Sequence, residues 1–263
     1  MHETTMRRGL EQLATIEGTD RPSIVEALRD IAPDLADMAI SFAYGEIYTR
    51  PALNLRQRQL VTVAALASMG GLEPQLKFHL AGALNVGCTP MELVELMTHL
   101  VVYAGFPVAL NGTAALKEML AQRGVAADAA VPAPATRTSR FDDGLACLRK
   151  IDGALGERVI SSLEDIAPDL GRFIVEFAFG DVYTRSGLDL VSRELVTVAA
   201  LASIGSATPQ LKVHMHGFLN VGGTREQLVE TVIHLCAYAG FPRAINAAMA
   251  ARDVLADRER SAH

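Results

Sequence analysis

The sequence predicts an all-α fold made of two homologous helical units. Three observations support this: helix-start and helix-stop signals recur along the chain, apolar residues follow helical spacing, and one long segment is repeated. Half of the residues are apolar (50%), only 5% are aromatic, and tryptophan is absent. This composition suits tightly packed helices.

The repeat is clearest over its central part. The first copy reads RQLVTVAALASMG at 58–70, and the second reads RELVTVAALASIG at 193–205. Likewise, the first copy reads HLVVYAGFPVALN at 99–111, and the second reads HLCAYAGFPRAIN at 234–246. The offset is 135 residues in both cases, so the chain is predicted to be a tandem duplication.

The repeat also predicts the domain boundaries. We expect a first unit at 1–124 and a second unit at 140–263. The segment between them, 125–139, is rich in Ala, Pro and Thr, a composition typical of an extended linker.

Helix signals follow one another through the first unit. Ser23 is expected to begin a helix after a proline. Residues 33–50 carry apolar side chains at the spacing of one helix face, which predicts a second helix. Asn54 is the expected cap of a third helix, which ends at Gly70.

The remaining elements of the unit have equally clear signals. Pro74 opens an expected helix that ends at Gly87. Thr89 and Glu92 form a Thr-x-x-Glu capping box before the next helix, and the last helix is expected to begin near Pro107.

One helix assignment has an alternative. The segment LVTVAALA at 60–67 contains β-branched residues that also suit a buried strand. Because no partner strands with turn signals lie nearby, a helix is the preferred prediction.

Charge and composition exclude several classes of function. The 24 basic and 30 acidic side chains give a net charge of -6, which argues against a nucleic-acid partner. The longest apolar run, Leu60 to Met69, is shorter than the roughly 18 residues of a membrane span, so no membrane partner is expected. The N-terminus shows no export signal, and Cys88, Cys147 and Cys236 form no CxxC pair. We therefore expect a cytoplasmic protein with reduced thiols.

Four motifs, in the same order in both halves, resemble the carboxymuconolactone decarboxylase family. They read RELVTVAAL, PQLKxH, NVGxT and YAGFPxAxN, with RQLVTVAAL in the first half, over about 20–120 and 155–255. The resemblance implies an all-α unit that assembles as trimers or hexamers. It also implies a decarboxylase of γ-carboxymuconolactone that uses no metal or organic cofactor. We therefore expect a homotrimer holding six units, a small carboxylated substrate and no cofactor.

A sister branch of similar fold is the alkylhydroperoxidase D type, which works through a Cys-x-x-Cys-x-x-x-His motif. Its cysteine positions fall on Leu72 and Gln75 in the first copy and on Ala207 and Gln210 in the second. Because neither copy has a thiol pair, peroxidase chemistry is not expected.

The resemblance implies that His79, His214 and Glu194 are catalytic. Neutral imidazole near pH 7 passes protons in either direction, which suits an enolate intermediate. Gln59 stands at the position of Glu194 in the first copy and cannot ionise. The alternative for the two histidines is a packed position in the core, and the alternative for Glu194 is a first-turn acid that the helix dipole favours.

Four repeated arginines are candidates for binding a substrate carboxylate, because guanidinium grips a carboxylate bidentately. Ordinary surface positions are the alternative for each of them. They are Arg50, Arg58, Arg185 and Arg193.

The segment around YAGFP lines the substrate pocket in the family, so the resemblance makes His99, His234, Tyr238 and Phe241 candidate substrate-binding residues. The alternative for the two histidines is a structural role. His216 has no counterpart in the first copy, and on a helix it diverges from His214 by about 200°, so no shared metal is expected.

Two hypotheses of different class follow. The first is a cofactor-independent lyase that decarboxylates a small cyclic carboxylated or enolisable substrate through a His/Glu proton relay. The second is a non-catalytic oligomeric ligand-binding protein, or a biosynthetic tailoring isomerase or cyclase.

Overall fold

The computed structural model of the chain describes residues 2–126 and 139–261. Within these ranges every regular element is a helix, which confirms the predicted all-α class. The segment LVTVAALA lies inside α4 (Leu55–Met69), so the helix prediction is correct and the strand alternative is wrong there. Most of the linker predicted at 125–139 lies outside the described residues.

The first unit contains three N-terminal helices, a π-helical segment and four core helices. They are α1 (His2–Glu17), α2 (Ser23–Leu28), α3 (Pro33–Met38), η1 (Ala39–Ile47), α4 (Leu55–Met69), α5 (Glu73–Asn85), α6 (Pro90–Ala104) and α7 (Phe106–Gln122).

The second unit repeats the same order. Its elements are α8 (Arg140–Ile151), α9 (Gly153–Ser161), α10 (Pro168–Phe173), η2 (Ile174–Tyr183), α11 (Leu190–Ile204), α12 (Thr208–Asn220), α13 (Arg225–Leu235) and α14 (Phe241–Ser261).

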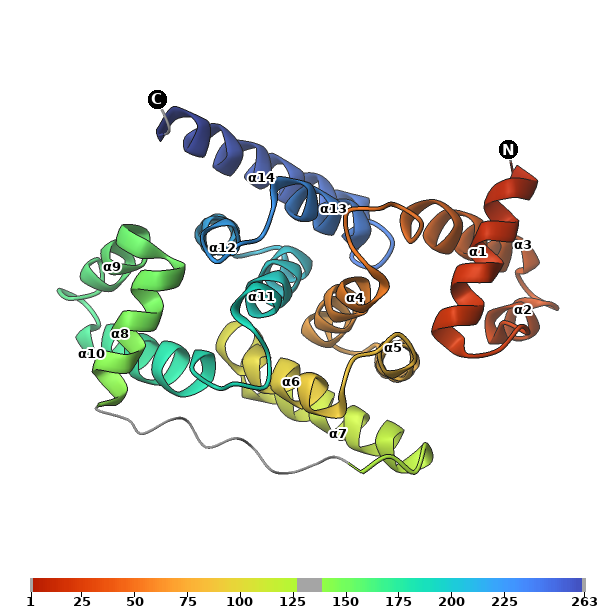
Figure 1. Cartoon of the computed structure of the whole chain (residues 1–263), viewed down its shortest axis with the longest axis horizontal. Coiled ribbons are helices and arrows are strands. Elements are labelled where there is room, and N and C mark those ends of the chain that lie inside the picture. Colours follow the sequence, from red (N-terminus) through yellow and green to blue (C-terminus); the bar gives the residue numbers. More distant parts are fainter. Residues whose placement is uncertain (1, 127–138, 262–263) are drawn as a thin grey trace.

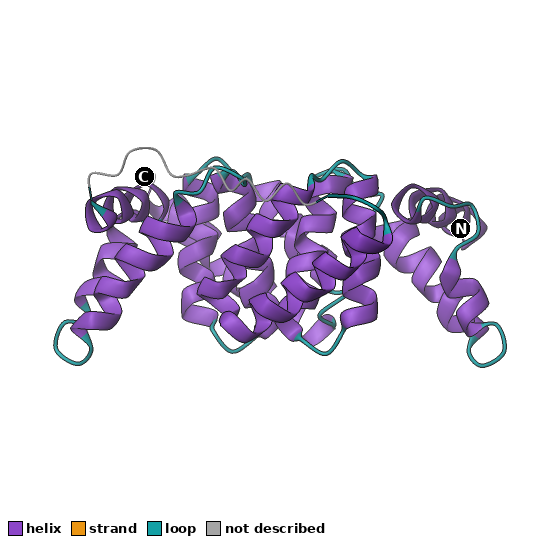
Figure 2. Ribbon diagram, turned by 90° about the horizontal axis from the view of Figure 1, so that it is seen from below, coloured by secondary structure: helices purple, strands orange, loops and turns teal. Residues whose placement is uncertain are grey.

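The two units form one central block with an arm of helices at each end (Figures 1 and 2). Helices α4 and α11 lie side by side at the centre, where the units meet most extensively. Leu60 and Leu93 of the first unit belong to the same buried apolar cluster as Val196 and Leu228 of the second. The duplication therefore builds one shared core, and side chains of one unit reach into the other.

Each arm contains a helix that the sequence analysis did not predict, α1 or α8. Helix α1 crosses η1 at two glycines: a Cβ on Gly9 would lie 2.1 Å from the Ile40 carbonyl oxygen, and one on Gly45 would lie 2.1 Å from the Thr5 oxygen. Only glycine permits this close approach. The helix expected over 33–50 is divided into α3 and the π-helical η1, a difference the apolar spacing does not reveal.

The predicted caps are confirmed. The Asn54 side chain accepts a hydrogen bond from the Gln57 amide, which completes a capping box at α4. Thr89 and Glu92 form the capping box of α6. Gly70 ends α4 with a φ of 68°, in the left-handed region that favours glycine. These caps fix the ends of the helices that carry the site. Within the described ranges, no helix is both long enough and apolar enough to span a membrane.

Candidate functional site

The second unit brings Glu194 and His214 together although they are twenty residues apart. Glu194 lies in the second turn of α11 and His214 in the middle of α12, and their side chains are buried. His214 Nδ1 lies 3.0 Å from Glu194 Oε2. Glu194 therefore binds Nδ1 of the His214 ring, and Nε2 of the same ring can bind a ligand.

The ion pair changes the protonation of His214. Burial alone would lower the pKa of this imidazole, but the charge and the hydrogen bond of Glu194 outweigh it and raise the pKa to about 8. Imidazolium is thus the favoured form of His214 at neutral pH.

Two tyrosines extend the pair, and one of them comes from the first unit. The Tyr183 hydroxyl donates a hydrogen bond to Glu194 Oε1. The Tyr103 hydroxyl, from α6 of the first unit, lies 2.5 Å from the Tyr183 hydroxyl. The Tyr103 ring also meets the His214 ring edge-on, with centroids 4.8 Å apart. The site of the second unit is therefore composite.

A cavity of about 290 Å³ opens on His214. Its polar lining includes Tyr103, Asp152 and Gln210, and most of the rest is apolar. The apolar side chains come from α6, α8, α9, η2, α11 and α12; they are Val102, Leu148, Val159, Ile160, Ile174, Ala178, Phe179, Leu201 and Val213. A small apolar pocket with a few polar groups is the usual form of a small-molecule site.

The cavity also contains the two positions at which the sister branch would carry cysteines. Ala207 and Gln210 line it, so no thiol faces His214 from these positions. The three cysteines are unpaired thiols, and burial raises the pKa of Cys88 and of Cys147 to about 12. Both thiols are therefore protonated near neutral pH, which makes them poor nucleophiles.

The first unit forms the matching arrangement with uncharged groups. His79 Nδ1 lies 2.9 Å from Gln59 Oε1, and the Gln59 amide donates to the Tyr48 hydroxyl over 3.4 Å. Tyr238, in the turn that follows α13 of the second unit, completes it with its hydroxyl 2.7 Å from that of Tyr48. Burial lowers the pKa of His79 to about 3, because no carboxylate opposes it. His79 is therefore neutral.

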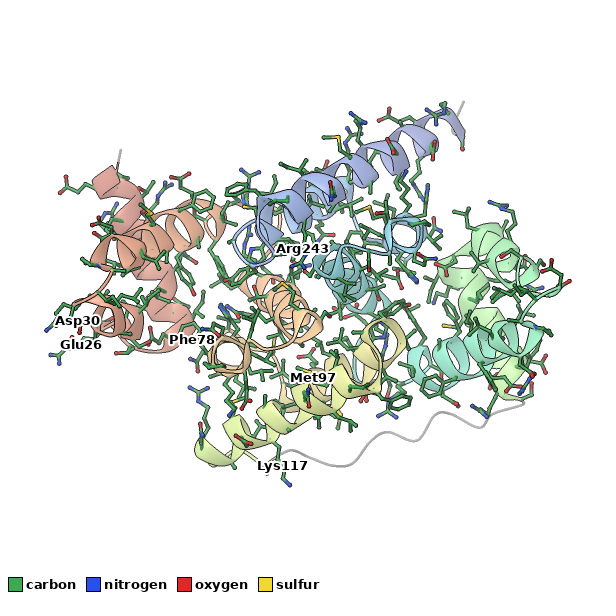
Figure 3. All side chains as sticks on the ribbon, turned by 180° about the vertical axis from the view of Figure 1, so that it is seen from behind. Glu26, Asp30, Phe78, Met97, Lys117 and Arg243 are labelled. Carbon is green, nitrogen blue, oxygen red and sulfur yellow. The ribbon has the colours of Figure 1, made fainter. Side chains whose placement is uncertain are left out.

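Bulkier side chains also occupy the first unit. Phe78 stands at the repeat position of Val213 and lies between α5 and the N-terminal helices, where it packs on the cluster around Leu13 and Ile16 (Figure 3). Tyr44 stands at the position of the cavity-lining Phe179. The two sites are thus related by sequence and differ in charge and in the side chains at these two positions.

The four arginines expected to bind substrate do not line the cavity at His214. Arg185 and Arg193 both donate to Glu95, a buried carboxylate of the first unit. At the equivalent positions of the repeat, Arg50 and Arg58 both donate to Glu230 of the second unit. These contacts favour a structural role in joining the units over the expected role in substrate binding.

His99 and His234 occupy buried positions between the units. His99 Nε2 lies 2.8 Å from the Thr197 hydroxyl, which itself donates to the Arg193 carbonyl. Thr197 therefore accepts from His99. Burial and, secondly, the charge of Arg193 lower the pKa of His99 well below its ordinary value. His234 makes the equivalent contact with Thr62. Both are placed as neutral, hydrogen-bonded core histidines.

Phe241 and His216 lie away from the cavity. Phe241 begins α14 and is 59% exposed, with its ring 6.1 Å from that of Phe42. His216 faces a separate outer pocket together with Arg158 and Arg258. Of the predicted site residues, His214 lines the cavity and Glu194 contacts His214. His79 and Tyr238 lie at the corresponding place in the first unit, together with Gln59.

Sequence reasoning missed Asp152 and Tyr183 as site residues. Asp152 is 5% exposed, lines the cavity and has its Oδ1 4.0 Å from His214 Nδ1. A signal was present, because the first copy also has an acid, Glu17, at the same repeat position. Among the described residues, no group of three or more His, Cys, Asp or Glu side chains is arranged to hold a metal ion.

Comparisons with known proteins agree with the predicted resemblance. A sequence model of the carboxymuconolactone decarboxylase family matches residues 33–118 and 168–253, well over half of the chain. A 4-carboxymuconolactone decarboxylase of Acinetobacter baylyi is 38% identical over 114 residues, which are 42% of this chain and 81% of that protein. A nitrosuccinic acid decarboxylase of Metarhizium robertsii is 31% identical over 121 residues, which are 44% of this chain and 82% of that protein.

The fold has a counterpart among solved structures. A structure named for a gamma-carboxymuconolactone decarboxylase subunit of Burkholderia xenovorans superposes with a TM-score of 0.59. The superposition covers 97% of this chain and 98% of the Burkholderia chain, and the two sequences are 23% identical. At this identity the likeness concerns the fold alone.

Proposed function

The chain belongs to the carboxymuconolactone decarboxylase family, and from this premise we propose that its second unit decarboxylates a small cyclic carboxylated or enolisable substrate. Relatives named as decarboxylases support a decarboxylase-like lyase function. The observation that carries the proposal is the Glu194–His214 ion pair, 3.0 Å between Oε2 and Nδ1, at the wall of a mainly apolar cavity.

The reaction needs a positive group where negative charge develops. As the bond to the carboxylate breaks, carbon dioxide leaves and the electron pair moves into the adjoining carbonyl, which becomes an enolate. His214 Nε2–H donates a hydrogen bond and then a proton to the enolate oxygen, and takes the proton back as the carbonyl re-forms. Glu194 orients the imidazole throughout and favours its charged form before and after the proton transfer.

The cavity supports the same step. Its volume of about 290 Å³ suits a single small ring compound, and its walls are largely apolar. A substrate carboxylate among Ile160, Ile174 and Phe179 loses much of its hydration, which costs free energy. Carbon dioxide is neutral and has no such cost, so the apolar walls favour its release. This scheme uses Tyr103 and Gln210 as the polar contacts of the substrate and needs no arginine.

The first unit is proposed to be a scaffold for this site. Gln59 cannot exchange a proton near neutral pH, and His79 is neutral in its buried position. The same unit nevertheless supplies Tyr103 to the site and Glu95 to the arginines behind it. In this proposal the second unit is catalytic, whereas both units contribute to the assembly.

A homotrimer is proposed as the assembled form. The two units expose apolar residues at equivalent positions, at an offset of 135. The exposure of Ile31 and Ile166, 80% each, indicates a surface that another copy of the chain covers. Further members of the set are Leu35 and Leu170, Met38 and Phe173, Phe106 and Phe241, and Leu110 and Ile245.

The test compares equivalent residues of the two units. Glu194→Gln and His214→Ala are expected to lower release of carbon dioxide from γ-carboxymuconolactone by about 10²–10⁴-fold, the usual cost of removing a positioned acid–base group. His79→Ala is the matched control and is expected to keep turnover. Equal loss of turnover in folded His79→Ala would contradict the assignment of chemistry to the second unit.

A further inference from the structure

Asp152 is a buried acid that the scheme above does not use. It lies between the end of α8 and the start of α9 and is 5% exposed. Its Oδ1 has no hydrogen-bond partner among the described residues and lies 4.0 Å from His214 Nδ1, beyond hydrogen-bond distance. An unpaired buried carboxyl oxygen is costly, so its retention here calls for a reason.

The position of Asp152 links the cavity to the surface. Asp152 lines the cavity that contains His214 and also lines the outer pocket of about 450 Å³. The outer pocket is open and basic, with Arg158, His216 and Arg258 in its wall. A group that faces both spaces is placed to carry a proton from one to the other.

A glycine allows two carboxyl groups to approach at this point. A Cβ on Gly217 would lie 2.9 Å from Glu194 Oε2 and 3.0 Å from Asp152 Oδ1. Two neighbouring buried carboxyl groups do not ionise equally. Glu194 accepts hydrogen bonds from Tyr183 and His214, which stabilise its carboxylate form, whereas Asp152 Oδ1 accepts none. The geometry therefore favours a proton on Asp152.

The surrounding charges agree with that distribution. Burial raises the pKa of Asp152 most, the charge of His214 opposes it and Glu194 adds to it, so that the pKa is about 7. Tyr103 and Cys147 also face this carboxyl group, and their hydroxyl and thiol stay neutral near pH 7. On the outer side the facing groups are Arg158, His216 and Arg258.

We propose that Asp152 is the acid that delivers a proton to the substrate carbon after carbon dioxide has left. The inference rests on the proposed decarboxylase function. Loss of carbon dioxide turns the substrate carboxylate into a carbanion equivalent, which takes the proton of the Asp152 carboxyl group and becomes a C–H bond. Asp152 is left as a carboxylate and takes a proton from solvent through the outer pocket. One proton is consumed per carbon dioxide released, and His214 ends each cycle as it began.

The first unit offers a matched control. Glu17 stands at the repeat position of Asp152, but its carboxylate accepts a hydrogen bond of 3.0 Å from the Ser23 amide at the start of α2. It serves as a helix cap rather than as a free acid. Asp152 also lies upstream of the second family match, which begins at residue 168, so the family pattern does not assign it.

The experiment uses the full-length protein with γ-carboxymuconolactone as the probe. Asp152→Asn keeps the shape of the side chain but removes the exchangeable acid. We expect kcat to fall by about 10²–10⁴-fold with little change in KM, and Asp152→Glu to recover part of the loss. Glu17→Gln is expected to keep wild-type kcat. In wild type, the Asp152 carboxyl signal in carbon NMR, identified by its absence from Asp152→Asn, should titrate near pH 7.

The outcomes separate the two proposals. Wild-type turnover that survives in folded Asp152→Asn would overturn the role of Asp152 and leave the proposed function intact. A carboxyl signal that titrates near the ordinary pH of an aspartate, about 4, would overturn it as well. Failure of wild type to release carbon dioxide from this lactone would overturn the proposed function for it, and the role of Asp152 with it.

Discussion

Arg193 of the second unit donates a hydrogen bond of 2.8 Å to Glu95 of the first, and neither side chain has exposed surface. Burial alone would raise the pKa of Glu95, but the hydrogen bonds from Arg185 and Arg193 outweigh it and hold the pKa below its ordinary value. Arg58 and Glu230 form the reciprocal pair, 3.1 Å apart. Each unit thus buries a charge that only the other unit neutralises.

This relationship predicts a large stability effect. Glu95→Gln leaves Arg193 charged and buried without its partner, so we expect the free energy of unfolding to fall by about 3–5 kcal/mol. Glu259→Gln is the control, because its pair with Arg225 is exposed and is expected to contribute at most about 1 kcal/mol. Urea unfolding of both variants measures the difference. Similar effects of the two substitutions would show that the buried pair does not hold the units together.

Restoring an acid to the first unit should charge its histidine. Gln59→Glu places a carboxylate next to His79 Nδ1, where the Gln59 oxygen now lies at 2.9 Å. We expect the pKa of His79 to rise from about 3 towards that of His214, about 8. NMR titration of the histidine ring signals measures this shift. An unchanged His79 would mean that some feature other than residue 59 sets its protonation.

The Glu194–His214 pair predicts a pH dependence of stability. The folded-state pKa of His214, about 8, lies above its ordinary value of 6.5. The ionised pair therefore stabilises the fold fully below about pH 6.5, and this contribution is lost as the pH rises through about 8. It amounts to about 2 kcal/mol at most. The wild-type advantage over Glu194→Gln in urea unfolding should shrink between about pH 6 and about pH 9, and a constant advantage would contradict it.

The composite site predicts unequal effects of two equivalent tyrosines. Tyr103→Phe removes the hydroxyl that lies 2.5 Å from Tyr183, whereas Tyr238→Phe removes its counterpart beside Tyr48. We expect the first change to lower turnover by about 3- to 10-fold, the effect of one hydrogen bond. The second should affect stability only. Initial rates of both folded variants decide the point, and a larger loss in Tyr238→Phe would indicate chemistry in the first unit.

The repeated apolar surface predicts association in solution. Ile31 and Ile166 are both 80% exposed on the two arms. Light scattering of the wild type is expected to give the mass of a trimer, and Ile31→Asp with Ile166→Asp should weaken it, because a charge is costly in a buried apolar contact. A stable wild-type monomer at micromolar concentration would contradict the assembly proposal.

The repeat, the all-α class and the helix caps can be predicted from the sequence alone. These features are local: Asn54 caps a helix through its own third neighbour, Gln57, and Thr89 does the same through Glu92. The repeat also shows the difference between Gln59 and Glu194, and each copy carries a histidine twenty residues further along the chain. Covalent order and short-range hydrogen bonds carry this information, so it can be read from one chain.

The side chains that meet across the two units are known from the folded structure and not from the sequence pattern. From the sequence, Arg193 is predicted to bind a substrate anion. In the structure Glu95, almost a hundred residues away, neutralises it. Tyr103 reads as part of the first unit, yet its hydroxyl belongs to the site of the second. The physical reason is the packing of α4 against α11, which brings buried charges and hydroxyls of both copies into one core, where each must find a partner.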